Sequence, residues 1–206
     1  MERIGCILIG YAFGTFLTAE LVARVLGHES AFSIGDGNPG MANIGRHLGK
    51  PAALAVLAGD IMKTVAAVLI SRTVFPQLES LSTAWAGLGA TLGHVFPFWH
   101  RFKGGKGVTT IASTIILMNP FWGIIAGVVG VSAIVVSGYL SVAAVVSMGF
   151  YAVAMLATGH PEFAFVSVVF QILTVYCHWS KIKGIKDGTT HRAGLSIRFW
   201  EMVRRK

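Results

Sequence analysis

Basic side chains stand among glycines at two places in the sequence. The first stretch reads "GDGNPGMANIGRH" and covers residues 35–47, and the second reads "RFKGGKGVTT" and covers residues 101–110. Glycines allow consecutive backbone N–H groups to turn toward one point, an arrangement that binds anions. A helix N-terminus adds the positive end of its dipole. Both stretches therefore predict phosphate binding, although a glycine-rich surface turn or a basic loop that only sets membrane topology would look similar.

In the second stretch, Lys106 lies between glycines just before an apolar run that begins at Val108. We expect this lysine to contact a phosphate, with the loop glycines supplying N–H groups. The spacing does not fit the Walker A pattern G-x-x-x-x-G-K-[ST]. The candidate binding residues of this stretch are Lys103, Gly104, Gly105, Lys106 and Gly107.

In the first stretch, Arg46 is the natural phosphate ligand, because a guanidinium group can form two parallel hydrogen bonds to an anion. The candidates here are Gly35, Asp36, Gly37, Asn38, Gly40, Asn43 and Arg46. The glycine spacing G-x-G-x-x-G is also the fingerprint of a dinucleotide-binding turn, but it carries that meaning only between a strand and a helix. No strand pattern precedes it, so we reject a dinucleotide site.

The rest of the chain is strongly apolar. Of its 206 residues, 54% are hydrophobic and only 13% are charged, about half the charge of an ordinary soluble domain. This composition predicts an all-α, polytopic membrane bundle with a single domain over residues 1–206 and no nucleic-acid partner. Seven apolar spans are expected at Ile4 to Val25, Ala52 to Phe75, Ser82 to Phe98, Val108 to Met118, Phe121 to Ser137, Leu140 to Thr158, and Phe163 to Tyr176.

The basic residues predict the orientation of these spans. With the N-terminus outside and the C-terminus cytoplasmic, the cytoplasmic segments are the loops 27–50 and 99–107 and the tail 177–206. Counting Arg24 at the cytoplasmic end of the first span, all but three of the 17 lysines and arginines then lie inside, as the positive-inside rule requires. The exceptions are Arg3, Arg72 and Lys63. Both candidate phosphate loops fall on this face.

Four further residues could take part in chemistry. Asp60 and Lys63 are three positions apart within a span, where charged groups are costly and are usually paired or functional. They form either a structural ion pair or an extension of the anion site. His94 and His178 lie at cytoplasmic ends of spans and could act as bases, although interfacial histidines are common there.

These stretches, in this order, resemble the PlsY-type acyl phosphate:glycerol-3-phosphate acyltransferases. The resemblance is closest at "GHVFPFWHRFKGGKGV", and it includes "GYAFGTFLTAELVAR", "GDGNPGMANIGR", "GDIMK" and, more weakly, "CHWSKIKGIKDGT". It implies an enzyme of the bacterial cytoplasmic membrane that moves a fatty acyl group from acyl phosphate to the 1-hydroxyl of glycerol 3-phosphate. It also implies membrane lipids as surroundings, and neither a metal nor a cofactor. Lys106, Arg46, Asp36 and His178 would be catalytic, and His94 and Lys181 would help bind substrate.

The chain departs from the family pattern at several positions. Asp36 stands where the family has serine, Ala42 where it has threonine, and Lys181 where it has asparagine; Trp179 replaces an arginine after His178, and "GTFL" replaces G-S-I-P. A carboxylate about 4 Å from a phosphate would oppose binding by several kcal/mol at an effective dielectric near 20. We therefore expect Lys181 to compensate Asp36. The alternatives are a catalytically silent relative that binds anionic lipid or a partner, and a small transporter with Asp60 and Lys63 along its path.

Overall fold

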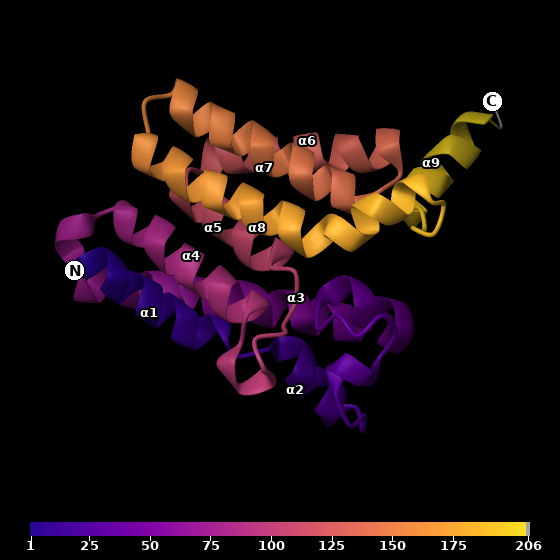
Figure 1. Cartoon of the computed structure of the whole chain (residues 1–206), viewed down its shortest axis with the longest axis horizontal. Helices are drawn as coiled ribbons and strands as arrows, with labels where there is room; N and C mark the ends of the chain where they lie inside the picture. The colour runs from indigo at the N-terminus through magenta and orange to yellow at the C-terminus, as the bar shows by residue number, and fades with distance from the viewer. Residues whose placement is uncertain (205–206) are drawn as a thin grey trace. The chain divides into compact units, whose positions relative to one another are not determined.

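The computed structural model describes residues 1–204, and helices are the only regular elements in that range. This confirms the all-α prediction. The chain forms two compact units, Met1–Met118 and Asn119–Lys206, and each is described by itself (Figure 1). The single domain expected over the whole chain stays a prediction. Arg205 and Lys206, the last residues of the predicted tail, lie outside the described residues.

The first unit holds five α-helices joined by short 3-10 turns. In chain order, with the 3-10 turns marked η, its elements are α1 (Glu2–Gly14), α2 (Thr18–Val25), η1 (Ala31–Ser33), α3 (Met41–Val74), η2 (Pro76–Leu78), α4 (Leu81–Val95), η3 (Phe98–His100) and α5 (Val108–Met118). The second unit holds α6 (Pro120–Ser137), α7 (Leu140–Ala157), α8 (Pro161–Lys186) and α9 (Gly194–Arg204).

Several of these helices are long and apolar enough to cross a membrane. Among the described residues, five segments meet that condition: Glu2–Val25, Met41–Val74, Pro120–Ser137, Leu140–Ala157 and Pro161–Lys186. Helix α5 is apolar but shorter. The chain is therefore a multi-pass membrane protein, while the number of seven spans and the outside position of the N-terminus stay predictions.

Glycines set the packing of α1 against α4, which lie side by side in the first unit (Figure 1). A Cβ atom at Gly10 or Gly14 would collide with backbone carbonyls of α4, and one at Gly89 or Gly93 would collide with carbonyls of α1. Both pairs are four residues apart, the small-xxx-small spacing that lets membrane helices approach closely. Backbone contact thus replaces side-chain interdigitation along this interface.

The first predicted span is broken, which corrects the expectation of one helix over Ile4 to Val25. Helix α1 ends at Gly14 and α2 begins at Thr18, with Leu17 in an extended conformation (φ −90°, ψ 102°). Residues 15–17 between them contain neither proline nor glycine, and Gly14 is the last residue of α1. The break is held instead by side chains from elsewhere in the fold, as the site geometry shows.

The predicted cytoplasmic loop 27–50 is also more ordered than expected. Helix α3 already begins at Met41 and changes direction at Gly49, whose φ of 87° is outside the helical region. Proline at position 51 follows directly, and a proline inside a helix removes one hydrogen bond and favours a kink. The membrane-crossing part after this kink agrees with the predicted span from Ala52 to within a few residues.

In the second unit, α6, α7 and α8 pack in sequence order (Figure 1). The turn predicted at Asn119–Pro120 is confirmed, because the Asn119 side chain caps α6 by accepting a hydrogen bond from the Trp122 amide. Helix α8 continues ten residues beyond the predicted end at Tyr176. This places the first part of the predicted tail on a helix, which continues through Gly184 and ends just before Gly188 (φ 71°).

The two candidate phosphate loops lie at the same end of the first unit. The Phe32 ring stacks on the His100 ring, with centroids 3.5 Å apart and planes at 10°. At the opposite end, the Gln77 side chain donates a hydrogen bond to Glu2, next to the N-terminus. This arrangement agrees with the alternation of helices that the charge pattern predicts.

We expect Gly89→Ala to destabilise the protein, because the new methyl group would strike the carbonyl of Ile7 on α1. Overpacking of this kind costs about 1–3 kcal/mol. The matched control is Gly127→Ala on α6, where a Cβ would meet nothing within 4 Å. Thermal unfolding in detergent should show a lower midpoint for the first variant only. Equal midpoints would contradict the close backbone packing of α1 and α4.

Candidate functional site

The first loop is organised by Asn43, whose side chain is fully buried. Its Nδ2 donates to the carbonyls of Ile34 at 2.7 Å and Asn38 at 3.1 Å, and its Oδ1 accepts from the Asp36 amide at 3.2 Å. An asparagine amide has two N–H donors, and both are used here. Asn43 was expected to contact substrate, but in this structure it shapes the loop.

The glycines of this loop serve its tight course. Gly35 and Gly37 have φ of 57° and 71°, a region that residues with a Cβ rarely adopt. A Cβ on Gly35 would also collide with the side chains of Asn43 and His47. Gly40 is the N-cap of α3, and no side chain caps that helix start. The glycine spacing therefore reflects a compact loop ahead of a helix, and residues 1–204 contain no strand of the kind that precedes a dinucleotide-binding turn.

Asp36 pairs with Arg46 inside this loop. The Arg46 Nη2 atom lies 3.4 Å from Asp36 Oδ2, and the two side chains are 58% and 30% exposed. The Asn38 amide also donates to Asp36, at 3.4 Å. An exposed ion pair contributes only about 0–1 kcal/mol, so Arg46 can exchange this carboxylate for a phosphate. The expected pair between Asp36 and Lys181 joins different units and stays a prediction.

The second loop packs against the end of α4. The Gly104 amide donates to the Val95 carbonyl at 2.9 Å, and the Gly105 amide donates to the His94 carbonyl at 3.0 Å. Each amide has a single proton, so these two groups are committed to α4. This corrects the expectation that they hold a phosphate. The half-buried Lys106 follows directly and remains the candidate ligand, with the exposed Lys103 nearby in sequence.

Two contacts that sequence reasoning missed tie the loops to the broken first helix. Glu20 Oε2 on α2 accepts hydrogen bonds from the Ser30 hydroxyl at 2.9 Å and the Ala31 amide at 2.8 Å. The Trp99 indole donates to the Thr15 carbonyl at 2.8 Å. The position of Glu20, an acidic residue near the end of an apolar span, was a signal in the sequence that it has a partner. Nothing in the sequence indicated the contact made by Trp99.

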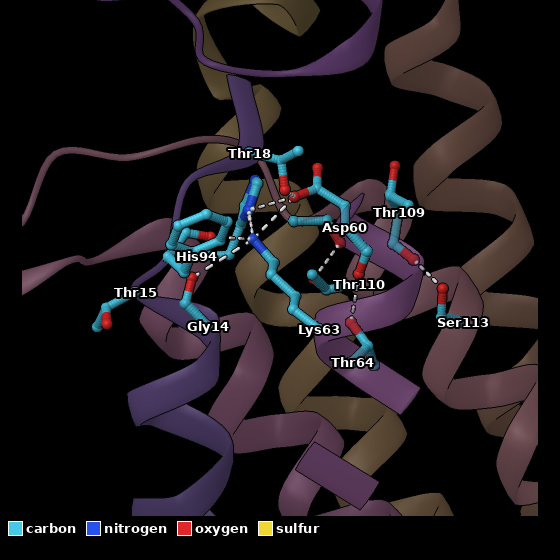
Figure 2. Close-up of polar contacts among 12 residues, drawn as sticks. Gly14, Thr15, Thr18, Asp60, Lys63, Thr64, His94, Thr109, Thr110 and Ser113 are labelled. Atoms are coloured by element: carbon cyan, nitrogen blue, oxygen red, sulfur yellow. Dashed lines mark hydrogen bonds and ion pairs between the residues drawn. The ribbon is translucent and has the colours of Figure 1, made fainter. Parts of the chain in front are cut away.

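Asp60, Lys63 and His94 form a buried charged cluster (Figure 2), which contacts the second loop through His94. Lys63 Nζ is 2.8 Å from Asp60 Oδ1 and 2.9 Å from His94 Nδ1. It also donates to the Phe16 carbonyl at 2.8 Å and approaches the Gly14 carbonyl at 3.4 Å. The ion pair expected from the spacing of Asp60 and Lys63 is thus present. His94, expected at the substrate, faces this lysine.

His178 and Lys181 belong to the second unit, where α8 carries both. The His178 ring is buried, and because a carbonyl can only accept, its Nδ1–H donates to the Thr174 carbonyl at 2.9 Å. In a neutral ring this leaves Nε2 as the basic nitrogen. The Lys181 carbonyl accepts from the Thr190 hydroxyl at 2.7 Å, which joins α8 to the following turn. Their approach to the loops of the first unit stays a prediction.

Fold and loops together define the class of the protein: a multi-pass helical membrane protein with two glycine-rich basic loops at one end of its first unit. The sequence profile described as "Glycerol-3-phosphate acyltransferase" matches residues 4–188. The chain belongs to this glycerol-3-phosphate acyltransferase family, as its resemblance to PlsY-type proteins predicts.

Individual relatives agree with this assignment. A glycerol-3-phosphate acyltransferase of Coxiella burnetii (strain CbuG_Q212) is 36% identical over 95% of this chain and 100% of its own length. The glycerol-3-phosphate acyltransferase 1 of Lactobacillus johnsonii is 38% identical over 66% of each chain. That of Lactobacillus acidophilus is 42% identical over 58% of this chain, which spans 57% of the relative's length.

Two solved structures share the fold. Both are crystal structures of PlsY, an integral membrane glycerol 3-phosphate acyltransferase. The glycerol 3-phosphate form has a TM-score of 0.83 and 27% identity, over 94% of this chain and 96% of its own. The lysophosphatidic acid form has a TM-score of 0.82 and 26% identity, over 95% and 97%.

We predict that Asn43→Leu loosens the loop, because the loop loses three hydrogen bonds, each contributing about 0.5–1.5 kcal/mol. Helix α3 should stay folded. Hydrogen–deuterium exchange in residues 34–40 should become faster. The matched control is Asn119→Leu, which removes the cap of α6 and should leave exchange in this loop unchanged. Unchanged exchange in Asn43→Leu would contradict the organising role of Asn43.

Proposed function

We propose that this chain is an acyltransferase that moves a fatty acyl group from acyl phosphate to the 1-hydroxyl of glycerol 3-phosphate. The hydroxyl oxygen attacks the acyl carbonyl carbon, and the bond from that carbon to the phosphate oxygen breaks. Inorganic phosphate leaves with the electron pair, and the product is lysophosphatidic acid. The reaction would supply phospholipid synthesis, and we place it at the cytoplasmic face of the bacterial inner membrane.

The observation that carries the proposal is the stacking of Phe32 on His100, which joins the two basic loops at one end of the first unit. Both substrates carry a phosphate, and each loop offers one basic side chain close to the start of a helix. Arg46 lies in the first turns of α3, and Lys106 lies two residues before α5. The dipole of α5 favours an anion beside Lys106, and Arg46, in the second turn of α3, contributes its own charge.

The relatives support the choice of substrates. The family profile and the curated relatives are named for glycerol 3-phosphate as acceptor. The two PlsY structures of the same fold are described as glycerol 3-phosphate and lysophosphatidic acid forms, which correspond to the proposed acceptor and product. Acyl phosphate as donor follows from the resemblance to PlsY-type enzymes.

Little covalent work remains for the protein, because acyl phosphate is already an activated donor. Catalysis would then consist of positioning both substrates and stabilising the negative charge that develops on the leaving phosphate. Lys106 is suited to that charge. The proton of the attacking hydroxyl goes to the leaving phosphate or to Nε2 of His178, whose tautomer the Thr174 carbonyl fixes.

Asp36 does not rule out this activity. Its carboxylate already has Arg46 as a partner, so its charge is partly balanced before a phosphate arrives. Replacing it by the serine of the family pattern would release Arg46 and remove the repulsion. We therefore expect Asp36→Ser to keep activity and to lower the KM of the substrate that Arg46 binds.

The test is phosphate release from purified protein in liposomes supplied with acyl phosphate and glycerol 3-phosphate. The wild type should release phosphate only when the acceptor is present. Lys106→Ala should lower kcat/KM by about 100-fold to 1000-fold, the usual effect of removing one charge-stabilising donor. Lys50→Ala is the matched control, since Lys50 is an exposed lysine on the same face that we place outside the site.

Acceptor-independent release, or equal losses in both lysine variants, would contradict the proposed site. An inactive wild type that Asp36→Ser activates would identify a silent relative that kept the scaffold and lost the reaction.

A further inference from the structure

The buried cluster of Asp60, Lys63 and His94 has no place in the reaction proposed above, although it contacts the second loop through His94. Resting on that proposed function, we infer that the cluster positions the Gly104–Gly107 loop and, through it, the phosphate ligand Lys106. Asp60, Lys63 and His94 are positioning residues in this account and do not touch substrate.

Lys63 contacts three separate parts of the first unit. A lysine ammonium group has three N–H donors. They have three near partners, each on a different part of the first unit: Asp60 Oδ1 on α3 at 2.8 Å, the Phe16 carbonyl in the break after α1 at 2.8 Å, and His94 Nδ1 on α4 at 2.9 Å (Figure 2). With all donors engaged, the ammonium group is fixed relative to three elements at once.

Asp60 holds this lysine in place and is itself held. The Thr18 hydroxyl at the start of α2 donates to Asp60 Oδ1 at 3.2 Å. The same oxygen is 3.8 Å from His94 Nδ1. The carboxylate therefore balances the charge of Lys63 and links α2 to α3 beside the broken helix.

The contact with Lys63 determines the tautomer and the orientation of the His94 ring. Because Lys63 can only donate, Nδ1 of His94 must accept, and the proton of the neutral ring is then on Nε2. That nitrogen faces the second loop, since a Cβ added to Gly105 would collide with it. The ammonium group thus fixes both the orientation and the tautomer of the ring on which the loop rests.

His94 in turn contacts the second loop directly. The His94 carbonyl accepts the Gly105 amide at 3.0 Å, and the neighbouring Val95 carbonyl accepts the Gly104 amide at 2.9 Å. A Cβ on Gly104 would collide with the His94 carbonyl. Ring and carbonyl of one residue therefore determine where Gly105 lies, and Lys106 is the next residue in the chain.

Holding the helices of the first unit together would not by itself require a buried charged cluster. A buried ion pair costs desolvation and can often be replaced by apolar residues without loss of stability. Apolar residues would not supply a donor that orients the His94 ring. The geometry therefore points to loop placement as the property that the charged cluster provides.

The test uses Asp60→Asn combined with Lys63→Met, so that no single buried charge is left without a partner. Because Lys106 is proposed to stabilise the charge on the leaving phosphate, steady-state kinetics in liposomes should show a kcat about tenfold or more below wild type, a loss in the same direction as that of Lys106→Ala. Arg72→Met is the matched control, because Arg72 links α3 and α4 at their other end through Thr83. It should leave both constants unchanged.

A second readout does not depend on activity. If the loop loses its support, trypsin should cut after Arg101 and Lys103 several times faster in the double variant and in His94→Ala, with cleavage after Arg192 unchanged. Faster cleavage at all these sites would mean general destabilisation and would overturn the inference. Unchanged kcat together with unchanged cleavage would also overturn it.

The two proposals can fail separately. A wild type that is inactive with both substrates would contradict the proposed function, and trypsin cleavage would still decide whether the cluster supports the loop.

Discussion

The break in the first helix depends first on the Lys63 ammonium group, with the Trp99 indole as a second donor. Between Gly14 and Thr18 the backbone leaves the helical path, which frees carbonyl groups of the first helix for other donors. In a membrane such groups must find donors inside the protein, or each costs several kcal/mol. Lys63 supplies the donor from α3, and Asp60 balances its charge.

Much of the candidate site follows from that break. It lets α2 carry Glu20 to the backbone of the first loop, and it lets Trp99 reach the Thr15 carbonyl from the second. The glycine contacts between α1 and α4 bring the same end of both helices together, where the Tyr11 hydroxyl donates to the Phe96 carbonyl at 2.7 Å. The loops are thus positioned by packing within the membrane part of the first unit.

The sequence was sufficient for features with a local cause. Apolar length predicted the helices, the Asn119–Pro120 pair predicted the start of α6, and the charge pattern placed both basic loops on one side. Motif order predicted the family. The break at residues 15–17 could not be predicted, because its cause is a lysine nearly fifty positions away. The same holds for the Gly104 and Gly105 amides, which looked available but are bound to carbonyls of α4.

The measurement that tests the account most directly is the identity of the product. Purified wild-type protein in liposomes would receive isotopically labelled glycerol 3-phosphate with either acyl phosphate or an acyl thioester, and the lipids would be analysed by mass spectrometry. The account predicts labelled lysophosphatidic acid from acyl phosphate, with one phosphate released for each molecule formed. No labelled lipid from acyl phosphate, or product from the thioester alone, would contradict it.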